Sequence, residues 1–260
     1  MKNDRKKISV ITVTWNRVEL LEEAIISVIN QGYENFEHIV IDNASTDGTV
    51  EMLKKYPHVI WISEPDNGQS DAMNKGLKLA TGDIFAWMND DDLYPSGVFE
   101  LINKKLDLNV YSFAYGLCDI IGRKGTCIGR SKFHKFDIER MMLGHNNVNT
   151  PAVFASIGLI RQVGLMDETL FATFDLDMWI RLSLLKPPLP LQEVTSLLRL
   201  HDNSGLMSAK VHLNERQKIR MKYKDKVSLR YKLIFDSYFK LRHYMYDRIV
   251  MKKYSKDMNI

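Results

Sequence analysis

The stretch Gly82-Asp-Ile-Phe-Ala-Trp-Met-Asn-Asp-Asp-Asp-Leu-Tyr-Pro95 is the part of the chain from which its fold can be worked out. An apolar run from Ile84 to Met88 has the length of a buried β-strand, and it ends abruptly in Asn89 and three aspartates. Three adjacent carboxylates repel one another unless water or a cation screens them, and such oxygen ligands suit Mg²⁺ or Mn²⁺. The carboxyl end of a strand in an open α/β sheet is also where ligands bind. The stretch is therefore either a metal site or a solvated turn that caps a helix beginning at Pro95.

The residues before this stretch alternate between strand and helix patterns. β-Branched or apolar runs predict strands over residues 8–14, 37–41 and 59–62, and helical spacing predicts helices over residues 18–30, 50–55 and 68–80. With the strand at 84–88, the alternation repeats four times. It predicts a parallel sheet that is covered by helices on both faces.

The turns after these strands lack two well-known phosphate-binding motifs. Trp15-Asn16-Arg17 follows the first strand in place of Gly-x-Gly-x-x-Gly, and no Gly-Lys-Ser/Thr loop occurs anywhere. Dinucleotide-dependent redox enzymes and P-loop NTPases are therefore disfavoured. The strand ends instead offer polar side chains that could hold a base and a ribose, namely Asn16, Asp42, Asn43, Ser45 and Asp47. Each of these could equally be a helix cap or a turn residue.

The second half of the chain is predicted less clearly. We expect a strand over 110–116, a hairpin over 118–129, a helix over 136–143, a strand entered through 149–154, and a short helix that closes at 161–164. The segment Thr173-Phe-Asp-Leu-Asp-Met-Trp-Ile-Arg181 then places Asp175 and Asp177 at the start of another helix. Taken alone, these carboxylates read as caps that favour the positive end of that helix.

Composition limits the class of protein. The 260 residues are 45% hydrophobic, which is ordinary for a globular protein, and two cysteines are too few for a disulfide framework. The apolar run at Ile8–Val13 is too short for a signal peptide and no stretch of ~20 apolar residues exists, so we expect a cytoplasmic location.

Charge is unevenly distributed along the chain. From Lys210 onward there are fifteen Lys and Arg against five Asp and Glu, a net charge of +10. Because the whole chain has a net charge of +4, the earlier residues carry a net charge of −6. We expect helices over 209–224 and 229–252, the second with interleaved basic and aromatic side chains. These helices could rest on the anionic inner face of the cell membrane, or pack as a hairpin on the acidic body or on another subunit of a homo-oligomer. No nucleic-acid-binding motif accompanies the charge.

Five motifs, in order and in register, resemble those of family 2 glycosyltransferases. They are Ser9-Val-Ile-Thr-Val-Thr-Trp-Asn-Arg17, Val40-Ile-Asp-Asn-Ala-Ser-Thr-Asp-Gly-Thr49, Ser63-Glu-Pro-Asp-Asn-Gly68, Ala72-Met-Asn-Lys-Gly76, and Thr81-Gly-Asp83 followed by Trp87-Met-Asn-Asp-Asp-Asp92. The resemblance covers roughly residues 8 to 200. It implies the GT-A fold: a Rossmann-like, mixed and mainly parallel sheet with helices on both faces, here followed by a C-terminal helical extension. We accordingly divide the chain into a glycosyltransferase domain at 1–207 and a basic extension at 208–260.

The resemblance also implies roles for individual residues. Nucleotide binding falls on Thr14, Asn16, Arg17, Asp42, Asp71, Asn74 and Asp90, and a divalent metal (Mn²⁺ or Mg²⁺) on Asp91, Asp92 and His201. The family's catalytic base falls on Asp175, with Asp177 as the second choice. Two positions depart from the family pattern: Asn89 replaces the first metal-motif aspartate, and Phe174 replaces a glutamate beside the base.

The sequence thus predicts an inverting, metal-assisted glycosyltransferase. It would move a sugar from a nucleotide donor, expected to be a UDP-sugar, to a hydroxyl of a glycan or lipid-linked acceptor, as in bacterial polysaccharide or lipopolysaccharide biosynthesis. Two alternatives stay open. A nucleotidyltransferase acting on sugar phosphates would share the sheet and the paired carboxylates but should carry a glycine-rich basic loop after the first strand. A non-catalytic nucleotide- or glycan-binding module would explain Asn89 and Phe174.

Overall fold

The first half of the chain alternates between strand and helix, as the sequence predicts. The computed structural model describes residues 5–142, 148–200 and 209–228. The elements of this half are β1 (Ile8–Thr14), α1 (Val18–Ile29), β2 (Phe36–Asp42), α2 (Thr49–Leu53), β3 (Val59–Ser63), α3 (Gln69–Leu79) and β4 (Ile84–Asn89). Each of these strands is followed by a helix that packs back on the sheet, which is the usual solution for strands buried on both faces.

The second half adds strands of both directions. Its elements are α4 (Val98–Lys105), β5 (Phe113–Ile121), β6 (Cys127–Arg130), α5 (Ile138–Met142), a 3₁₀ turn η1 (Thr150–Ala152), β7 (Val153–Ser156), α6 (Ile157–Val163), α7 (Phe174–Ser183), β8 (Leu189–Arg199), α8 (Ala209–Tyr223) and a final 3₁₀ turn η2 (Lys224–Lys226).

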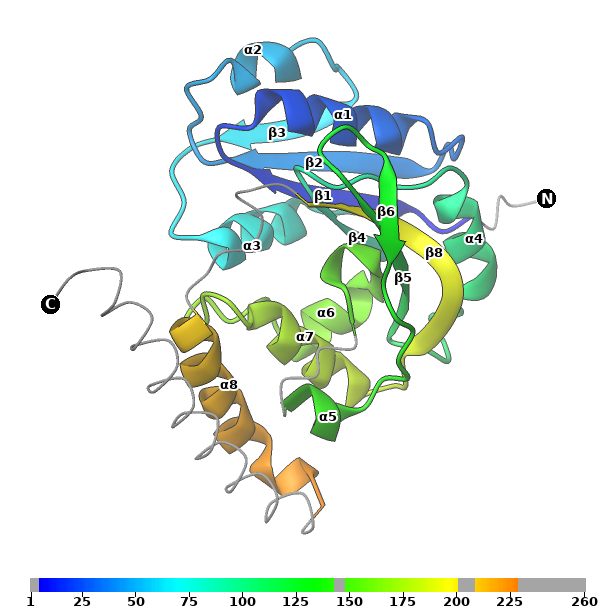
Figure 1. Cartoon of the computed structure of the whole chain (residues 1–260), viewed down its shortest axis with the longest axis vertical. Coiled ribbons are helices and arrows are strands. Elements are labelled where there is room, and N and C mark those ends of the chain that lie inside the picture. Colours follow the sequence, from blue (N-terminus) through cyan, green and yellow to red (C-terminus); the bar gives the residue numbers. More distant parts are fainter. Residues whose placement is uncertain (1–4, 143–147, 201–208, 229–260) are drawn as a thin grey trace, which may run out of the picture.

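One mixed sheet joins the two halves (Figure 1). Its order is β3-β2-β1-β4-β7-β5-β6, and β8 pairs with β5. Strands β1 to β4 are mutually parallel, β7 runs antiparallel between β4 and β5, and β8 is parallel to β5. Strand β1 ends level with its neighbours, because Thr14 is in register with Asp42 and Val13 with Asn89. The predicted fold class, a mixed and mainly parallel sheet, is confirmed.

Helices cover both faces of the sheet. On one face, α3, α6, α7 and α8 share a core cluster that includes Phe85, Trp87 and Trp179. On the other face, α1 and α4 pack against Val10, Ala86 and Phe154. Helix α2 completes that side by packing with α1 over β2. The layered arrangement leaves the carboxyl edge of β1, β2 and β4 for the loops that follow these strands.

Two predicted boundaries are wrong. The strand expected at 110–116 begins only at Phe113, because the N–H groups of Val110 and Tyr111 both donate to the carbonyl of Asp107 and close a turn. The helix expected to begin at Pro95 starts at Val98, after Gly97 adopts a left-handed conformation with φ +79°.

Strand β8 was not predicted at all. Its eleven residues include Pro190, and the residues that follow are partly polar. It nevertheless pairs with most of β5. The two strands approach so closely at Gly116 that a Cβ atom there would overlap the side chain of Thr195. Glycine is therefore required at that position.

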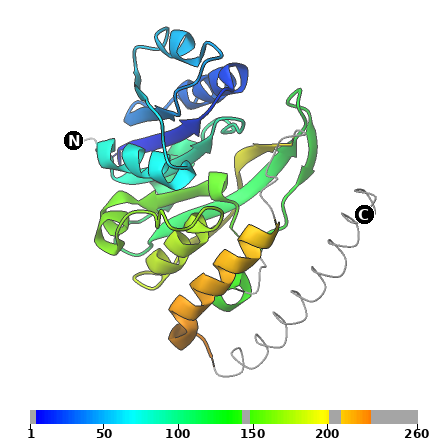
Figure 2. The same ribbon diagram turned by 90° about the vertical axis from the view of Figure 1, so that its left-hand side faces the viewer.

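The first predicted tail helix is confirmed as α8, and it is not a free arm. Ile219 and Tyr223 are buried in the same core cluster as α3 and α7, and Figure 2 shows α8 (orange) lying along the second half of the domain. The second predicted tail helix, 229–252, and with it the proposed membrane contact, lies outside the described residues. Among the residues described, no helix is long and apolar enough to cross a membrane.

Candidate active site

The loops after β1 and β2 are tied to each other by hydrogen bonds. The backbone N–H of Asn16 donates to Ser45 Oγ (2.8 Å), and the N–H of Thr46 donates back to Asn16 Oδ1 (2.8 Å). Asn16 and Ala44 both have positive φ, +52° and +48°. Positive φ is uncommon for residues other than glycine, and such backbone strain concentrates at functional sites. The two loops thus form one fixed surface at the carboxyl edge of the sheet.

Asp42, at the end of β2, holds the loop that follows it by hydrogen bonds. Its carboxylate is fully buried and accepts hydrogen bonds from the backbone N–H and hydroxyl of Ser45 and from Ser63 Oγ (2.6 Å). A buried carboxylate is stable only when its oxygens are satisfied in this way. In this conformation Asp42 braces the loop that carries Ser45, and its contact with a nucleotide base stays a prediction.

The last residue of β1, Thr14, and Arg17 in the loop after it hold the acidic turn that follows β4. Thr14 Oγ1 donates to Asp90 Oδ2 (2.9 Å), and Arg17 Nη1 lies 3.1 Å from Asp90 Oδ1 and 2.7 Å from Asp91 Oδ2. The structure therefore brings together four of the residues that the sequence assigns to donor and metal binding, although they come from two separate loops.

Asp92 is held by different partners. Its Oδ1 accepts from the backbone N–H of Arg199 (2.8 Å), and its Oδ2 accepts from Asn89 Nδ2 (2.7 Å). Asn89 Oδ1 in turn accepts from Trp87 Nε1 (2.8 Å). Asn89, the departure from the family's metal motif, thus supports Asp92 by donating a hydrogen bond that an aspartate in its place could not donate.

Arg199 is a site residue that sequence reasoning missed. Its buried guanidinium donates to the carbonyls of Asp91 (2.9 Å) and Arg123 (2.7 Å) and pairs with Glu23. It reaches the acidic turn because β8 ends beside it, where Leu93 and Leu197 form an isolated bridge. The signal available was its place two residues before His201, the position that resembles a family metal ligand.

The acidic turn concentrates negative charge in a buried place. Burial raises the pKa of Asp90 to about 6, and the neighbouring Asp91 adds to the rise although Arg17 opposes it. Burial together with the charge of Asp91 raises the pKa of Asp92 to about 7. A cation bound nearby would stabilise the ionised form of these carboxylates and lower their pKa values.

The acidic turn supplies some, but not all, of the ligands that a divalent ion needs. Within residues 5–142, 148–200 and 209–228, no group of three His, Cys, Asp or Glu side chains is arranged to hold a metal. Asp91 and Asp92 nevertheless supply two carboxylates, and Mg²⁺ commonly takes one or two carboxylates together with substrate phosphates and water. His201, the third predicted ligand, lies outside the described residues.

Asp175 shares a cavity with Asn89, the residue that directly precedes the acidic turn. The cavity, of about 240 Å³, is lined by Gln69, Trp87, Asn89, Thr150, Phe171, Ala172, Phe174, Asp175 and His212. Thr150 Oγ1 donates to Asp175 Oδ2 (2.6 Å), and the N–H of Leu176 donates to Oδ1 (2.7 Å), so the carboxylate is fixed at the first turn of α7. Phe174 stacks on Trp87 with ring centroids 5.8 Å apart and so forms part of the inner wall.

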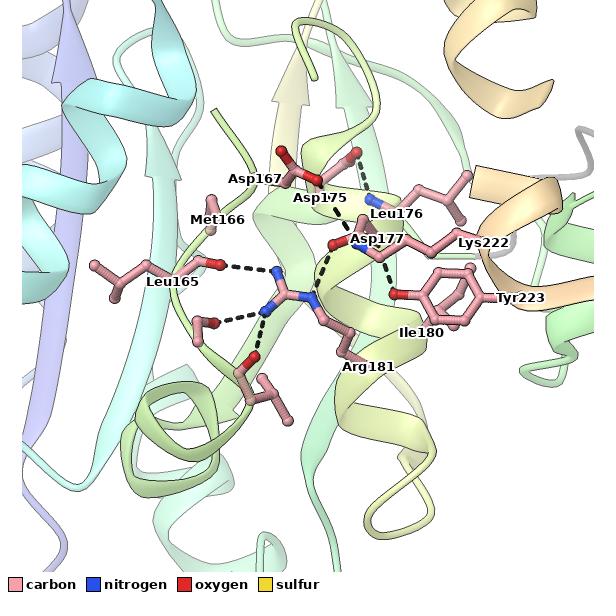
Figure 3. Close-up of polar contacts among 12 residues, drawn as sticks. Leu165, Met166, Asp167, Asp175, Leu176, Asp177, Ile180, Arg181, Lys222 and Tyr223 are labelled. Carbon is pink, nitrogen blue, oxygen red and sulfur yellow. Dashed lines mark hydrogen bonds and ion pairs between the residues drawn. The ribbon is translucent and has the colours of Figure 1, made fainter. Parts of the chain in front are cut away.

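Asp177, the second choice for the base, points elsewhere (Figure 3). Its side chain is fully buried and accepts hydrogen bonds from Arg181 Nε, Lys222 Nζ and Tyr223 OH, each at 2.8 Å. It is not among the residues that line the cavity. A carboxylate occupied by two cations and a phenol serves to join helices, so the geometry favours Asp175 of the two.

Two predicted nucleotide ligands on α3 form hydrogen bonds within the protein, and their contact with a nucleotide stays a prediction. Asn74 is buried, and its amide exchanges hydrogen bonds with the backbone of Met166 (2.9 and 3.0 Å) and donates to Glu168 (2.7 Å). Asp71 accepts from the N–H of Asn67 (3.0 Å) at the start of the helix. Asn74 joins α3 to the segment before α7, and Asp71 braces the loop into α3. Neither role requires a nucleotide.

Comparison with known proteins decides the family. The model of glycosyl transferase family 2 matches residues 9–163, which is more than half of the chain. The chain belongs to this family. The matched region ends before α7, the helix that carries Asp175.

Relatives agree with this assignment. An uncharacterized glycosyltransferase of Rickettsia typhi is 29% identical over 218 residues, covering 80% of this chain and 68% of that protein. Another, of Rickettsia prowazekii, is 30% identical over 184 residues, covering 67% of this chain and 58% of that protein. The chain thus spans well under the full length of both relatives.

Solved structures share the fold. The S. aureus TarS 1-349 structure in complex with UDP-GlcNAc has a TM-score of 0.67 at 19% identity, covering 82% of this chain and 64% of that one. The mannosyltransferase PcManGT from Pyrobaculum calidifontis, in complex with GDP-Man and Mn²⁺, has a TM-score of 0.60 at 16% identity, covering 90% and 79%. The glycosyltransferase therefore has the GT-A architecture that its motifs imply.

Proposed function

We propose that this glycosyltransferase moves a sugar from a nucleoside diphosphate donor to an acceptor hydroxyl with inversion, and that Asp175 is the general base. One observation carries the proposal: the Asp175 carboxylate lies in a cavity of about 240 Å³ that is also lined by Asn89, the last residue of β4, which the acidic turn follows directly. In that space a donor sugar and an acceptor hydroxyl could meet.

The chemistry would be a single displacement. The acceptor oxygen forms a bond to the anomeric carbon while the bond between that carbon and the donor phosphate oxygen breaks, and the nucleoside diphosphate leaves. Asp175 takes the acceptor proton as the new bond forms, because a neutral hydroxyl is a weak nucleophile. A single attack from the face opposite the leaving group inverts the anomeric centre.

The donor side would be formed by the loops after β1, β2 and β4. Asn16 and Arg17 would contact the nucleoside diphosphate from the loop after β1, and Asp42 would do so from the end of β2; the hydrogen bonds that fix the loops after these two strands support this role. Asp91 and Asp92 would hold a divalent ion, which when bound offsets the charge that develops on the leaving diphosphate. Arg17 and Arg199 keep the carboxylates of this turn in place.

Support for the donor class comes from two directions. TarS has been crystallised with UDP-GlcNAc, and PcManGT with GDP-Man and Mn²⁺, on the same fold. The resemblance of the sequence motifs favours a UDP-sugar and an acceptor in a bacterial polysaccharide or lipopolysaccharide pathway. We propose both on that basis, with a glycan or a lipid-linked sugar as the acceptor.

The test measures nucleoside diphosphate release from a panel of UDP-, GDP- and dTDP-sugars with Mn²⁺ or Mg²⁺. Slow release by hydrolysis, greater with one sugar nucleotide than with the others and lost with a chelator, is the expected result. Pyrophosphate formed from a nucleoside triphosphate and a sugar phosphate would instead identify a nucleotidyltransferase. Binding of sugar nucleotides without any release, across a wide range of acceptors, would reduce the protein to a binding module.

A further inference from the structure

A buried carboxylate of α8 fixes the loop that leads into the base-bearing helix. Glu215 is 6% exposed and accepts three hydrogen bonds from consecutive residues: the N–H of Phe171 (2.6 Å), the N–H of Ala172 (2.8 Å) and the hydroxyl of Thr173 (3.0 Å). Hydrogen bonds to an ionised acceptor are roughly twice as strong as neutral ones. The conformation of this loop therefore depends on α8, which lies beyond the region matched by the family model.

The far end of α8 is anchored to the same helix by the Asp177 cluster (Figure 3). Lys222 and Tyr223 donate to Asp177, and Arg181, one turn further along α7, donates to Asp177 and to the carbonyls of Val163, Gly164 and Leu165. Helix α8 is thus linked to the chain on both sides of Asp175. Glu215 on α8 binds residues 171–173 before it, and Asp177 on α7, after it, binds Lys222 and Tyr223 of α8.

Helix α8 also contributes to the cavity itself. His212 lines the cavity together with Phe171 and Asp175. The ring of Phe171 is 57% exposed at this wall, and it rests on Gly68, where a Cβ atom would come within 3.2 Å of the ring. A large aromatic side chain that is more than half exposed beside a cavity, and whose backbone is held by a buried carboxylate, has the properties of a binding surface.

We propose that α8 builds the acceptor subsite: Phe171 and His212 bind a sugar ring of the acceptor, and Glu215 is the positioning residue that holds Phe171 in place. The proposal rests on the proposed function, because it takes the cavity beside Asp175 as the place of the acceptor. The apolar C–H face of a pyranose fits the exposed ring, and its hydroxyls fit the imidazole nitrogens. The donor-binding loops after β1 and β2 supply none of these groups.

The experiment measures sugar binding separately from catalysis. Methyl α- and β-glycosides of glucose, galactose, mannose and N-acetylglucosamine are titrated against the full chain loaded with UDP and diamagnetic Mg²⁺, and saturation-transfer NMR reports binding. At least one glycoside should bind the unmodified protein. Its dissociation constant should rise about tenfold in Phe171→Ala and in His212→Ala, and Phe171→Trp, which keeps an aromatic face, should bind within about threefold of the unmodified protein.

Glu215→Gln distinguishes positioning from a merely structural role. Its amide cannot accept all three hydrogen bonds, so glycoside affinity should fall while UDP affinity, measured by calorimetry, stays within about twofold. Phe133→Ala, another exposed aromatic that does not line the cavity, and Glu193→Gln, a surface partner of Lys105, are the matched controls and should change neither.

Several outcomes would overturn the proposal. One is unaltered glycoside binding in both Phe171→Ala and His212→Ala; another is the absence of any glycoside binding to the UDP-loaded protein. Parallel loss of UDP and glycoside affinity in Glu215→Gln would reduce that residue to a structural role. Because Phe171 is exposed, its variants decide the matter even if Glu215→Gln does not fold. Failure of the proposed function would appear separately, as the absence of sugar-nucleotide turnover in the unmodified chain.

Discussion

Two aspartates that are two residues apart on α7 should respond to the same substitution in opposite ways. Asp175→Asn removes the only group on α7 that combines a carboxylate with a place in the cavity. Asp177→Asn removes a fully buried carboxylate that binds Arg181, Lys222 and Tyr223. The pair therefore serves as its own control, because local sequence, helix and chemical change are matched.

The expected magnitudes follow from the contacts. For Asp175→Asn, the amide oxygen can keep the hydrogen bond from the Leu176 N–H, and the amide NH₂ can donate to Thr150 Oγ1, because a hydroxyl also accepts. The free energy of unfolding should therefore change by less than about 1 kcal/mol. Loss of a general base should lower transfer by about 10²–10⁴-fold. For Asp177→Asn, the single amide oxygen cannot serve both sides: the NH₂ group faces either Arg181 or the pair Lys222 and Tyr223, where it meets one cation. Breaking such a buried pair costs about 3–5 kcal/mol.

The assay combines urea unfolding with sugar-nucleotide turnover at a temperature where both variants are folded. Asp175→Asn should unfold near the urea midpoint of the unmodified protein, bind UDP normally and have almost no turnover. Asp177→Asn should unfold at clearly lower urea and keep turnover within about tenfold when folded. The reverse pattern, with an active Asp175→Asn and an inactive but stable Asp177→Asn, would refute the assignment of the base to Asp175.

Three further predictions concern other parts of the domain. Arg199→Lys cannot keep separate hydrogen bonds to three partners, so it should lower the free energy of unfolding by about 2–3 kcal/mol in urea titrations and weaken UDP binding; an unchanged midpoint would contradict this. Asp91→Ala should abolish Mn²⁺ binding as followed by electron paramagnetic resonance in the presence of UDP, and retained binding would move the ion elsewhere. Burial, with a smaller contribution from His58, lowers the pKa of His38 to about 3, so protons bind the unfolded chain more readily below pH 6.5 and stability is lost as the pH falls. Between pH 7 and pH 5 the stability difference between the unmodified protein and His38→Gln should shrink by about 2 kcal/mol; the difference is used because the raised pKa of Asp92 acts in the opposite direction. A difference that does not vary with pH would show that His38 is not buried in its neutral form.

The first half of the fold follows from the sequence because its strands are regular. Each is a short β-branched or apolar run bounded by polar turn residues, and their carboxyl ends meet at one edge of the sheet, which is why Arg17 and Asp91 could be expected near each other. The motifs added the family, and the structure agrees with the fold they imply.

The elements of the second half are harder to predict from the sequence because tertiary contacts determine them. Strand β8 carries Pro190, a residue that argues against a strand, and only its pairing with β5 reveals its role. The role of Arg199 could not be predicted for the same reason, because its partners lie on three separate loops or helices. The motif assigns Asn74 to donor binding, which stays a prediction, but it does not reveal the hydrogen bonds of Asn74 with Met166, 92 residues away in the chain.

The anchoring of α8 also affects the order in which the protein can form as it is synthesised. Lys222 and Tyr223, the partners of Asp177, are made 45 and 46 residues after it, and the chain leaves the ribosome from its N-terminus onward. Until that later segment has emerged, Asp177 lacks two of its three hydrogen-bond donors, and a buried carboxylate so poorly compensated is costly. The nucleotide-facing edge needs Arg199 from β8 but no residue of α8, so it can be complete before the α7 region of the cavity is. A nascent chain that has emerged only through residue 208 should bind a sugar nucleotide yet be unable to transfer its sugar.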